Sequence, residues 1–322
     1  MTIHSISVEL LERAVATLRA GHLLALPTET VYGLGADASN PDAVKKIFSL
    51  KGRPSSHPVI VHITDVSQLS KWAREVSDDA IKLAHAFWPG PFTLVLKRAA
   101  GVSDVVTGGQ DTVAVRVPRH PIAQQLLRAF AGGIAAPSAN RFGHVSPTLA
   151  SHVRDEFGDS LLVLDGADCE IGLESTIVSC VDTVPRLLRP GGITLSQLRA
   201  VVSSVTDVVS NDAPRAPGML EKHYSPDTPI RIVSASELSS LVAEYVQHGD
   251  RIAVLAMHAA AKARDCVHWI DAGDDAAAYG HSLYANLRYL DKYSAACILV
   301  EQVPVGEHWQ AVRDRLQRAA AK

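Results

Sequence analysis

Cationic and hydroxyl side chains gather in residues 27–63, which read PTETVYGLGADASNPDAVKKIFSLKGRPSSHPVIVHI. A short apolar run over residues 23–26 precedes them and gives way to hydroxyls, a carboxylate and a tyrosine. A predicted short helix then delivers Lys51 and Arg53, and a predicted buried strand carries His62 near its end. Paired cations and hydroxyls beside a glycine turn suit a phosphate-bearing substrate. The segment therefore predicts part of a phosphate-binding site.

Four further polar groups follow, on or after short apolar runs: Thr112 with Arg116, Ser138 with Asn140, Ser175 with Thr176, and Arg189. Thr112 and Arg116 are four residues apart on a predicted strand, so their side chains face the same way. An arginine on the buried side of that strand needs an anionic partner, because an unpaired buried charge is costly. Each group alone also fits an ordinary turn or helix end, but their joint occurrence indicates one composite site.

The familiar nucleotide and metal motifs are missing from the sequence. Gly33-Leu34-Gly35 lacks the third glycine of a dinucleotide-binding turn, so we predict only a tight structural turn there. No P-loop, HExxH, Gly-x-Ser-x-Gly or EF-hand pattern occurs. The four cysteines have no CxxC spacing, which argues against a zinc site or a disulfide framework and favours reduced thiols.

Hydrophobic periodicity predicts an irregular succession of helices and strands through residue 200. Ser7, Asn40 and Ser77 are predicted helix N-caps, and Gly21 and Gly52 are predicted helix ends. Strands are predicted over residues 23–26, 58–63, 92–96, 112–117, 134–136, 161–164, 176–181 and 186–188. Because helices and strands do not alternate strictly, we expect an α/β fold with a mixed sheet.

The character of the sequence changes at residues 203–229, which contain three proline turns and no periodic apolar face. Beyond them, a regular alternation predicts a small Rossmann-like three-layer α/β domain, with strands at 230–233, 252–256, 267–270 and 297–300 and helices at 236–247, 276–292 and 307–320. The predicted organisation is a first domain over 1–205, a linker over 206–229 and a smaller domain over 230–322.

Charge argues against a nucleic-acid-binding domain. The net charge is -3, and a division near residue 210 leaves 19 Lys and Arg against 20 Asp and Glu before it, and 12 against 14 after it. Neither part is basic, so bulk electrostatics do not favour nucleic-acid binding. The sequence shows no signal-peptide pattern and no apolar run long enough to span a bilayer. We therefore expect a cytoplasmic protein without membrane attachment.

The strings PTETVYGLG, KGRPxxxPVIVH, TVAVRVP, APSAN, ESTIV and LLRPG, in this order, resemble the YrdC-like domain across residues 10–200. The string APGMLEKHYSP before a small α/β domain resembles the two-domain threonylcarbamoyl-AMP synthases. The resemblance implies a twisted open mixed sheet and a nucleotidyltransferase that converts L-threonine, bicarbonate and ATP to threonylcarbamoyl-AMP and pyrophosphate. In the family, a tRNA threonylcarbamoyl transferase complex then uses the product for the t6A modification beside the anticodon of tRNA.

The resemblance also assigns the site residues. The catalytic cations are Lys51 and Arg53, placed to offset charge on the phosphates as pyrophosphate leaves. Threonine is bound by Thr30, His62, Arg116, Ala136 (through its backbone) and Ser175, and ATP by Arg53, His57, Thr112, Ser138, Asn140, Ser146, Arg189 and Tyr224. Arg116 can take the threonine carboxylate with its planar fork. Mg²⁺ is expected on the ATP phosphates, held mostly by substrate oxygens and water.

Two of these assignments lead to predictions of their own. His57 stands where the family usually has asparagine, and an imidazole cannot reproduce the hydrogen-bond geometry of an amide. We therefore expect His57 to contact the nucleotide less well, or with some pH dependence. Tyr224 lies in the predicted linker, so we expect the linker to fold over the site as a lid that keeps water from the labile product.

Two other interpretations stay open at this point. As a binding module, the chain would offer double-stranded RNA a concave basic surface, as a ribosome-maturation factor without turnover, and weak RNA binding also fits the enzyme. As a carbamoyl-transfer enzyme, it would resemble hydrogenase-maturation proteins, although those carry zinc-finger-like segments and this chain has no CxxC. Pyrophosphate release from ATP that depends on threonine and bicarbonate together would separate the enzyme from both alternatives.

Overall fold

The computed structural model describes residues 5–207, 213–219, 223–260 and 265–321. Contacts divide the chain into two compact units. The first contains Met1–Phe142 and Pro147–Met219, and the second contains Gly143–Ser146 and Leu220–Lys322. The segment predicted as a linker is therefore shared between the units, with its first part up to Met219 belonging to the first.

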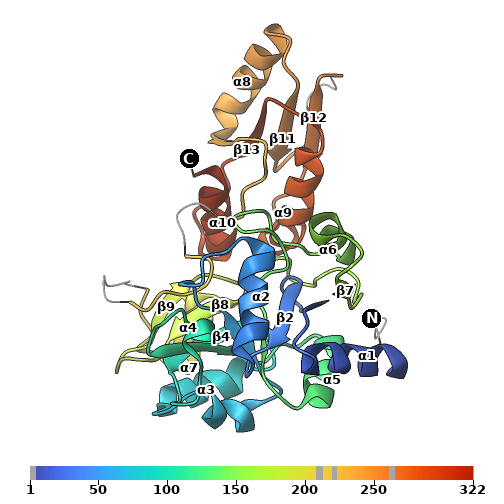
Figure 1. Cartoon of the computed structure of the whole chain (residues 1–322). Helices are drawn as coiled ribbons and strands as arrows, with labels where there is room; N and C mark the ends of the chain where they lie inside the picture. Colours follow the sequence, from blue (N-terminus) through green and yellow to red (C-terminus); the bar gives the residue numbers. More distant parts are fainter. Residues whose placement is uncertain (1–4, 208–212, 220–222, 261–264, 322) are drawn as a thin grey trace. The chain divides into compact units, whose positions relative to one another are not determined.

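A nine-stranded sheet forms the centre of the first unit (Figure 1), with the strand order β7-β1-β2-β6-β3-β5-β4-β8-β9. The strands are β1 (Leu24–Leu26), β2 (Gly33–Asp37), β3 (Ile60–His62), β4 (Phe92–Lys97), β5 (Thr112–Arg116), β6 (Ile134–Ala135), β7 (Leu162–Val163), β8 (Thr176–Ser179) and β9 (Arg186–Arg189). β3 pairs with β5 in parallel, whereas β4 pairs with β5 antiparallel. The predicted mixed sheet is confirmed.

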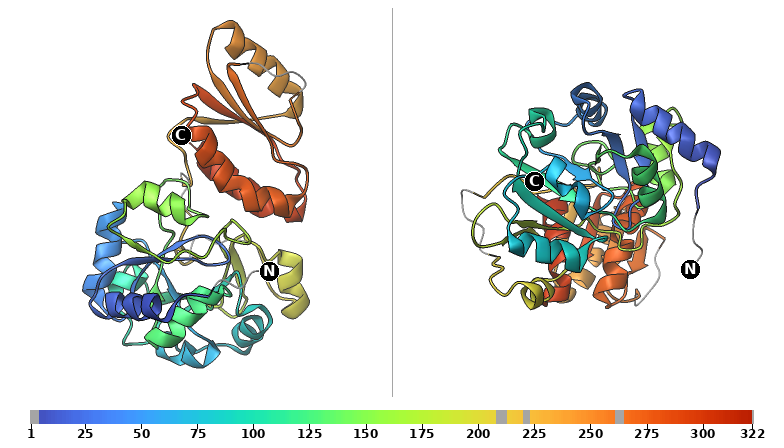
Figure 2. Two further views of the ribbon diagram at one scale, coloured as in Figure 1. Left: turned by 90° about the vertical axis from the view of Figure 1, so that its right-hand side faces the viewer. Right: turned by 90° about the horizontal axis from the view of Figure 1, so that it is seen from below.

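Helices cover both faces of this sheet. They are α1 (Val8–Arg19), α2 (Pro41–Lys51), α3 (Asp78–Phe87), α4 (Asp104–Thr107), α5 (Pro121–Phe130), α6 (Ala150–Phe157), α7 (Leu195–Val201) and the 3-10 helix η1 (Val66–Lys71). Apolar residues of α2, α3, α6 and α7 share one core with alternate strand residues. On the other face, α1 and α5 lie side by side against β1 and β6 (Figures 1 and 2). The rest of that second face, at β3, β5, β4 and β8, is where polar residues gather.

The local signals in the sequence account for the helix ends. Ser7 and Ser77 accept backbone N–H groups at the starts of α1 and α3, and Asn40 does so before the proline that begins α2. Gly52 ends α2 in the left-handed region, with a φ of 66° that glycine adopts without strain. These predicted caps are confirmed, and the end of α2 sets the direction in which Lys51 and Arg53 leave the helix.

Some predicted elements differ from the structure. Gly33-Leu34-Gly35 begins strand β2 and is not a tight turn. Glycine is needed there for packing, because a Cβ on Gly35 would lie 2.9 Å from a methyl of Leu26 and 3.1 Å from one of Ile134. The short helices η1, α4, α6 and α7 were not predicted, since they span too few turns to show a clear apolar period.

The second unit contains a four-stranded parallel sheet with the order β10-β13-β11-β12. Its elements are β10 (Ile230–Val233), α8 (Ala235–Gln247), β11 (Ile252–Ala256), β12 (Val267–Asp271), α9 (Ala276–Asp291), β13 (Cys297–Glu301), η2 (Glu307–Trp309) and α10 (Gln310–Ala320). α8 packs on one face, and α9 and α10 pack on the other (Figure 2). The predicted three-layer arrangement is confirmed, with the last predicted helix divided into η2 and α10.

Two further predictions concern what the chain lacks. All four cysteines are free thiols, as their spacing indicated. Among the helices that can be described, none has both the length and the apolar character needed to cross a membrane.

Candidate functional site

Polar side chains line up across adjacent strands on one face of the nine-stranded sheet. His62 of β3 is the register partner of Arg116 of β5, which is in turn the register partner of Thr93 of β4. Side chains alternate between the two faces of a strand, so these three share a face with Ile60 and Ala114. Their neighbours in sequence point into the helix-covered core. The strand period thus places the polar row on the face that lacks those helices.

The first group on this face is the Glu29–Arg116 cluster, which consists of Thr28, Glu29, Thr30, His62 and Arg116. Arg116 Nη2 lies 2.8 Å from Glu29 Oε1, and the two side chains are 4% and 2% exposed. Arg116 Nη1 donates to Thr30 Oγ1 at 2.8 Å, and its Nε donates to Gly90 O at 3.2 Å. Glu29 Oε2 accepts the N–H of Arg119 at 3.0 Å. Acceptors from two segments, residues 29–30 and Gly90, therefore hold the three nitrogens of the guanidinium.

The hydrogen-bond directions in this cluster can be assigned. Thr28 Oγ1 donates to Val31 O at 2.6 Å, so the 2.8 Å contact between the Thr28 and Thr30 hydroxyls uses the hydrogen of Thr30. Thr30 also accepts from Arg116, which leaves one lone pair on its oxygen. Thr30 can therefore only accept a further hydrogen bond. It suits a ligand hydroxyl or amine and not a carboxylate.

The protonation states of the cluster follow from its burial and its ion pair. Burial acts to raise the pKa of Glu29, but the charge and hydrogen bond of Arg116 and the N–H of Arg119 together hold that pKa below its ordinary value. Burial, followed by the charge of Arg116, lowers the pKa of His62 to about 3, so its ring is neutral. His62 Nδ1 is buried and has no hydrogen-bond partner among the residues that the structure describes. That nitrogen is available to a ligand.

The polar row continues toward β9 through Ser175 and Arg189. Ser175 Oγ lies 2.7 Å from Thr93 Oγ1, and Arg189 donates to Ser175 O from Nε at 3.1 Å and from Nη2 at 2.9 Å. The turn after Arg189 requires glycine, because a Cβ on Gly191 would lie 2.3 Å from the backbone nitrogen of Thr176. This close approach of two segments brings the predicted threonine ligand Ser175 against the predicted nucleotide ligand Arg189.

The second group is the Lys51–Arg53 cluster, which consists of Lys51, Arg53, His57, Ser138 and Asn140. Lys51 is 3% exposed, and its Nζ donates to Ser138 O at 2.6 Å and to Asn140 O. Burial, followed by the charge of Arg53, lowers the pKa of Lys51 well below its ordinary value. An ammonium has three donors, so one N–H of Lys51 is left for a ligand. Lys51 is thus an anchor for the loop at residues 138–140, a role that the sequence did not reveal.

Arg53 and His57 follow on the same segment. Arg53 is 9% exposed and its Nη2 donates to Pro58 O at 2.8 Å. The His57 ring is half-buried and lies 5.5 Å from the Phe142 ring, centroid to centroid. Burial, followed by the charges of Arg53 and Arg215, lowers the pKa of His57. The ring is therefore neutral at pH 7 and can donate or accept one hydrogen bond at each nitrogen.

Backbone pairing brings two of the sequence motifs together. The N–H of Leu34 donates to Pro137 O at 2.7 Å, and the N–H of Ala139 donates to Tyr32 O at 2.8 Å. The TETVYGLG segment thus lies beside the APSAN segment, with Ala136 buried at its start. This pairing explains why residues about a hundred positions apart contribute to one site.

Residues 213–219, which lie within the predicted linker, pack on the same sheet face. Their apolar side chains contact β3, β4, β5 and β8. Arg189 Nη1 donates to Pro217 O at 2.8 Å. Gln110 and Arg215 exchange two hydrogen bonds, of 3.1 and 2.8 Å. The segment therefore covers part of the face that carries the polar row.

Besides Arg189, three predicted nucleotide ligands lie outside both clusters. Thr112 is half-buried at the start of β5. Ser146 and Tyr224 are buried and belong to the second unit. The Tyr224 ring is stacked at 5.6 Å from the Tyr284 ring and lies 5.3 Å from the guanidinium carbon of Arg315. The contacts of these three residues with ATP remain predictions.

Sequence patterns did not identify Glu29 as a residue of the site. Glu29 was noted only as a carboxylate among hydroxyls, and no role was assigned to it. A signal was nevertheless present, because an acid directly after a buried apolar strand, between two threonines, is unusual for a solvated loop. The arginine that was expected to need an anion has Glu29 as its partner.

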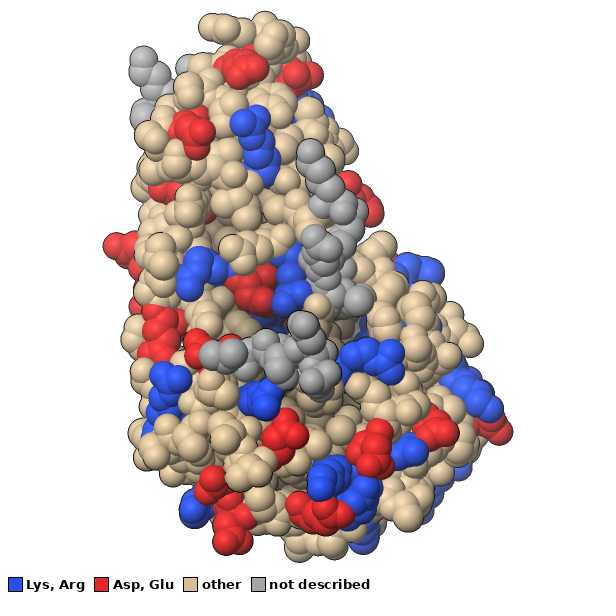
Figure 3. Space-filling model, turned by 90° about the vertical axis from the view of Figure 1, so that its left-hand side faces the viewer, with Lys and Arg blue, Asp and Glu red and all other residues tan. Residues whose placement is uncertain are grey.

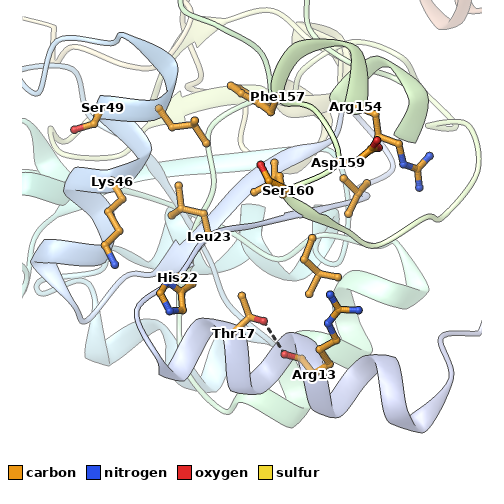
Figure 4. Close-up of a pocket in the computed structure, with 14 residues that line it drawn as sticks. Arg13, Thr17, His22, Leu23, Lys46, Ser49, Arg154, Phe157, Asp159 and Ser160 are labelled. Carbon is orange, nitrogen blue, oxygen red and sulfur yellow. Dashed lines mark hydrogen bonds between the residues drawn. The ribbon is translucent and has the colours of Figure 1, made fainter.

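A hollow of about 910 Å³ lies elsewhere in the first unit (Figure 4). Its walls come from α1, α2, α6 and β7, with Arg13, Lys46 and Arg154 among apolar side chains such as Leu23 and Phe157. None of the predicted site residues lines it. We therefore locate the functional site by the buried polar row and not by the size of this hollow.

The described residues contain no group of three or more His, Cys, Asp or Glu side chains that could hold a metal ion. Cations and neutral hydrogen-bonding groups dominate the Lys51–Arg53 cluster. That donor set suits an anionic ligand. A metal ion there would depend on oxygens that the ligand and water bring.

Comparison with family models covers nearly the whole chain. Residues 16–191 match a model described as "Telomere recombination", and residues 193–321 match one described as "Threonylcarbamoyl-AMP synthase, C-terminal domain". The first match contains every residue of both clusters, and the second match begins shortly before the predicted linker.

Full-length relatives give the same result. The chain is 41% identical to a threonylcarbamoyl-AMP synthase of Bacillus subtilis, with 96% of this chain and 92% of the relative covered. It is 39% identical to one of Pyrococcus abyssi, with 95% and 93% covered. A crystal structure of P. abyssi Sua5 complexed with L-threonine superposes with a TM-score of 0.91 at 38% identity, over 98% of this chain and 96% of that one.

Proposed function

Because the chain belongs to the threonylcarbamoyl-AMP synthase family, we propose that it converts L-threonine, bicarbonate and ATP to threonylcarbamoyl-AMP and pyrophosphate. A C–N bond forms between the threonine amine and the bicarbonate carbon, with loss of water. An O–P bond forms at the α-phosphate of ATP, with loss of pyrophosphate. The enzyme is thus a nucleotidyltransferase, and its product supplies a tRNA threonylcarbamoyl transferase for the t6A modification.

The observation that best supports this function is the presence of two neighbouring clusters with different charge. In the Glu29–Arg116 cluster one carboxylate balances one guanidinium, which suits a zwitterionic amino acid. In the Lys51–Arg53 cluster two buried cations donate to backbone carbonyls, which suits the phosphates of ATP. An enzyme that joins an amino acid to a nucleotide needs both environments.

On the amino-acid side, each residue has a role that its hydrogen bonds allow. Arg116 retains one N–H on each terminal nitrogen after its contacts with Thr30 and Glu29, enough for a bidentate grip on the threonine carboxylate. Thr30 offers an acceptor to the threonine amine or hydroxyl. His62 offers its open nitrogen, and Ser175 and the backbone of Ala136 complete the proposed set.

On the nucleotide side, Lys51 and Arg53 stabilise negative charge on the phosphates as pyrophosphate departs. Lys51 also fixes the loop that carries Ser138 and Asn140, so one side chain would position the nucleotide ligands and contribute charge. Arg189 and Thr112 are the proposed ligands from β9 and β5. Mg²⁺ would be held by phosphate oxygens and water and would supply further positive charge at the phosphates.

The lid hypothesis is supported by residues 213–219, which already pack on the sheet face that carries the clusters. Tyr224 follows shortly after this segment and is proposed to contact the nucleotide. Tyr224→Phe keeps the ring that packs on Tyr284 and removes only the hydroxyl. We expect it to raise KM for ATP several-fold or to speed loss of the adenylate, without a change in unfolding. Unchanged KM and product lifetime would argue against a lid that uses this hydroxyl.

The proposed function is tested by pyrophosphate release from ATP with each substrate omitted in turn. Release should require threonine and bicarbonate together, and mass spectrometry should find threonylcarbamoyl-AMP. Release that depends on carbamoyl phosphate would favour a carbamoyl-transfer enzyme. RNA binding without any turnover would favour the RNA-binding interpretation, although the face in Figure 3 shows acidic and basic side chains intermixed and not a broad basic surface.

A further inference from the structure

Glu29 is a buried carboxylate in the site to which the proposed function assigns no substrate contact. Its side chain is 2% exposed, and its two oxygens contact the Arg116 guanidinium at 2.8 Å and the Arg119 N–H at 3.0 Å. A buried ion pair is costly to form and is not needed for a stable core, since apolar residues of the same size often serve as well. The cost of burying this pair therefore points to a role beyond packing.

We infer that Glu29 is a positioning residue, which orients Arg116 for the threonine carboxylate and supplies the negative charge that lets a zwitterionic amino acid enter a buried site. This inference rests on the proposed function. Glu29, Thr30 and Gly90 each hold one nitrogen of the guanidinium, so its plane is set before the substrate arrives. Glu29 is the one charged member of these three acceptors.

The charge of Glu29 affects the total charge of the buried site when threonine is bound. With Glu29 present, the substrate carboxylate and ammonium join one negative and one positive side chain, and the buried set stays neutral. Without the carboxylate of Glu29, the same zwitterion leaves one uncompensated positive charge, which is costly in a low-dielectric site. Threonine with a neutral amine would then bind better than the zwitterion.

The charged and titratable groups around Glu29 keep the same charge over the pH range in which the threonine amine titrates. Arg116 faces it from β5, His62 from β3, and Cys169 from the segment after β7. His62 has a pKa of about 3, and burial raises the pKa of the Cys169 thiol far above its ordinary value. Glu29 itself is ionised at neutral pH. Among these groups and the bound threonine, the amine of threonine is therefore the one whose charge changes between pH 6.5 and 9.

The experiment is a titration of L-threonine at pH 6.5, 7.5 and 9, with pyrophosphate release as the readout, on the full-length enzyme. Glu29→Gln should raise KM for threonine about 10-fold or more at pH 7.5, the size expected for one charged hydrogen-bonding group. KM for ATP should not change, and the rise should shrink at pH 9 as the amine loses its proton. Glu29→Asp, which keeps the charge, should recover part of the loss.

The matched control is Glu170→Gln, an exposed carboxylate that pairs with Arg119, and it should leave both KM values unchanged. A wild-type KM for threonine in Glu29→Gln would overturn the inference. So would an equal rise in KM for threonine and ATP with no dependence on pH, because that pattern describes general damage. If Glu29→Gln does not fold, Glu29→Asp keeps the charge but is too short to hold the guanidinium as Glu29 does, so it should still raise KM for threonine. A normal threonine KM in Glu29→Asp then overturns the positioning role. Wild-type enzyme without threonine-dependent release would refute the proposed function itself.

Discussion

The buried cations of the two clusters have different kinds of partner. Arg116 is paired with the carboxylate of Glu29, so its charge is cancelled within the protein. Lys51 donates to the carbonyl oxygens of Ser138 and Asn140, which solvate the ammonium without neutralising it. After burial, the nearby charge of Arg53 is the main cause of the lowered pKa of Lys51. One cluster is balanced and the other retains positive charge.

This difference shows that the partner of a cation, and not the cation itself, decides which ligand a site suits. A balanced pair can accept a ligand that carries one charge of each sign. Cations that donate to carbonyl oxygens keep their net positive charge, which attracts a polyanion. The following predictions test this comparison, from the largest expected effect to the smallest.

Removal of Arg116 should have the largest effect, because it leaves Glu29 buried without a counter-ion. Arg116→Ala is expected to lower the free energy of unfolding by about 3–5 kcal/mol, measured by urea denaturation. The control is Arg119→Ala, which breaks an ion pair whose side chains are 49% and 63% exposed and should cost about 1 kcal/mol or less. Equal losses in the two variants would mean that the buried pair has no special weight.

Replacement of Lys51 tests the other cluster. Lys51→Met should lower kcat for pyrophosphate release about 100-fold or more, the usual effect of losing one preorganised charged donor. Lys45→Met removes an exposed cation from the same helix, where it pairs with Asp42, and should leave kcat unchanged. A loss of stability in Lys51→Met with normal kcat would assign Lys51 to holding the loop alone.

Acid should weaken the balanced cluster through Glu29. Its pKa is lowered in the folded state, so its contribution to stability is complete above the ordinary value of 4.5 and is lost as pH falls through the folded-state value. Between pH 6 and pH 3.5, wild type should therefore lose more unfolding free energy than Glu29→Gln, by about 1 kcal/mol. Glu170→Gln is the exposed control. Parallel pH curves for wild type and Glu29→Gln would show that the pair does not perturb Glu29.

The smallest effect is expected at His57, at the edge of the Lys51–Arg53 cluster. Its ring is half-buried and neutral at pH 7, so it adds no charge to the cluster. His57→Asn should leave turnover intact or raise it, as measured by kcat and KM for ATP at pH 7. A large loss of activity would give the imidazole a role of its own.

Features that depend on residues close together in the sequence could be predicted, and features that depend on distant residues could not. Helix caps at Ser7, Asn40 and Ser77 depend on residues within one turn, and the sequence was enough to place them. The mixed sheet followed from the irregular alternation of apolar runs. The strand β2 was mistaken for a turn at its glycines, because their use as close-packing positions appears only when β1 and β6 lie beside them.

By itself, the sequence determined the motif residues, the two α/β regions, the near-neutral charge and the need of Arg116 for an anion. The tertiary structure alone decided that the anion is Glu29, that Lys51 anchors residues 138–140, and that residues 143–146 belong with the second unit. The physical reason is strand order. Periodicity shows which face a side chain occupies, but the neighbour across that face depends on which distant strands pair, as β3 does with β5 and β6.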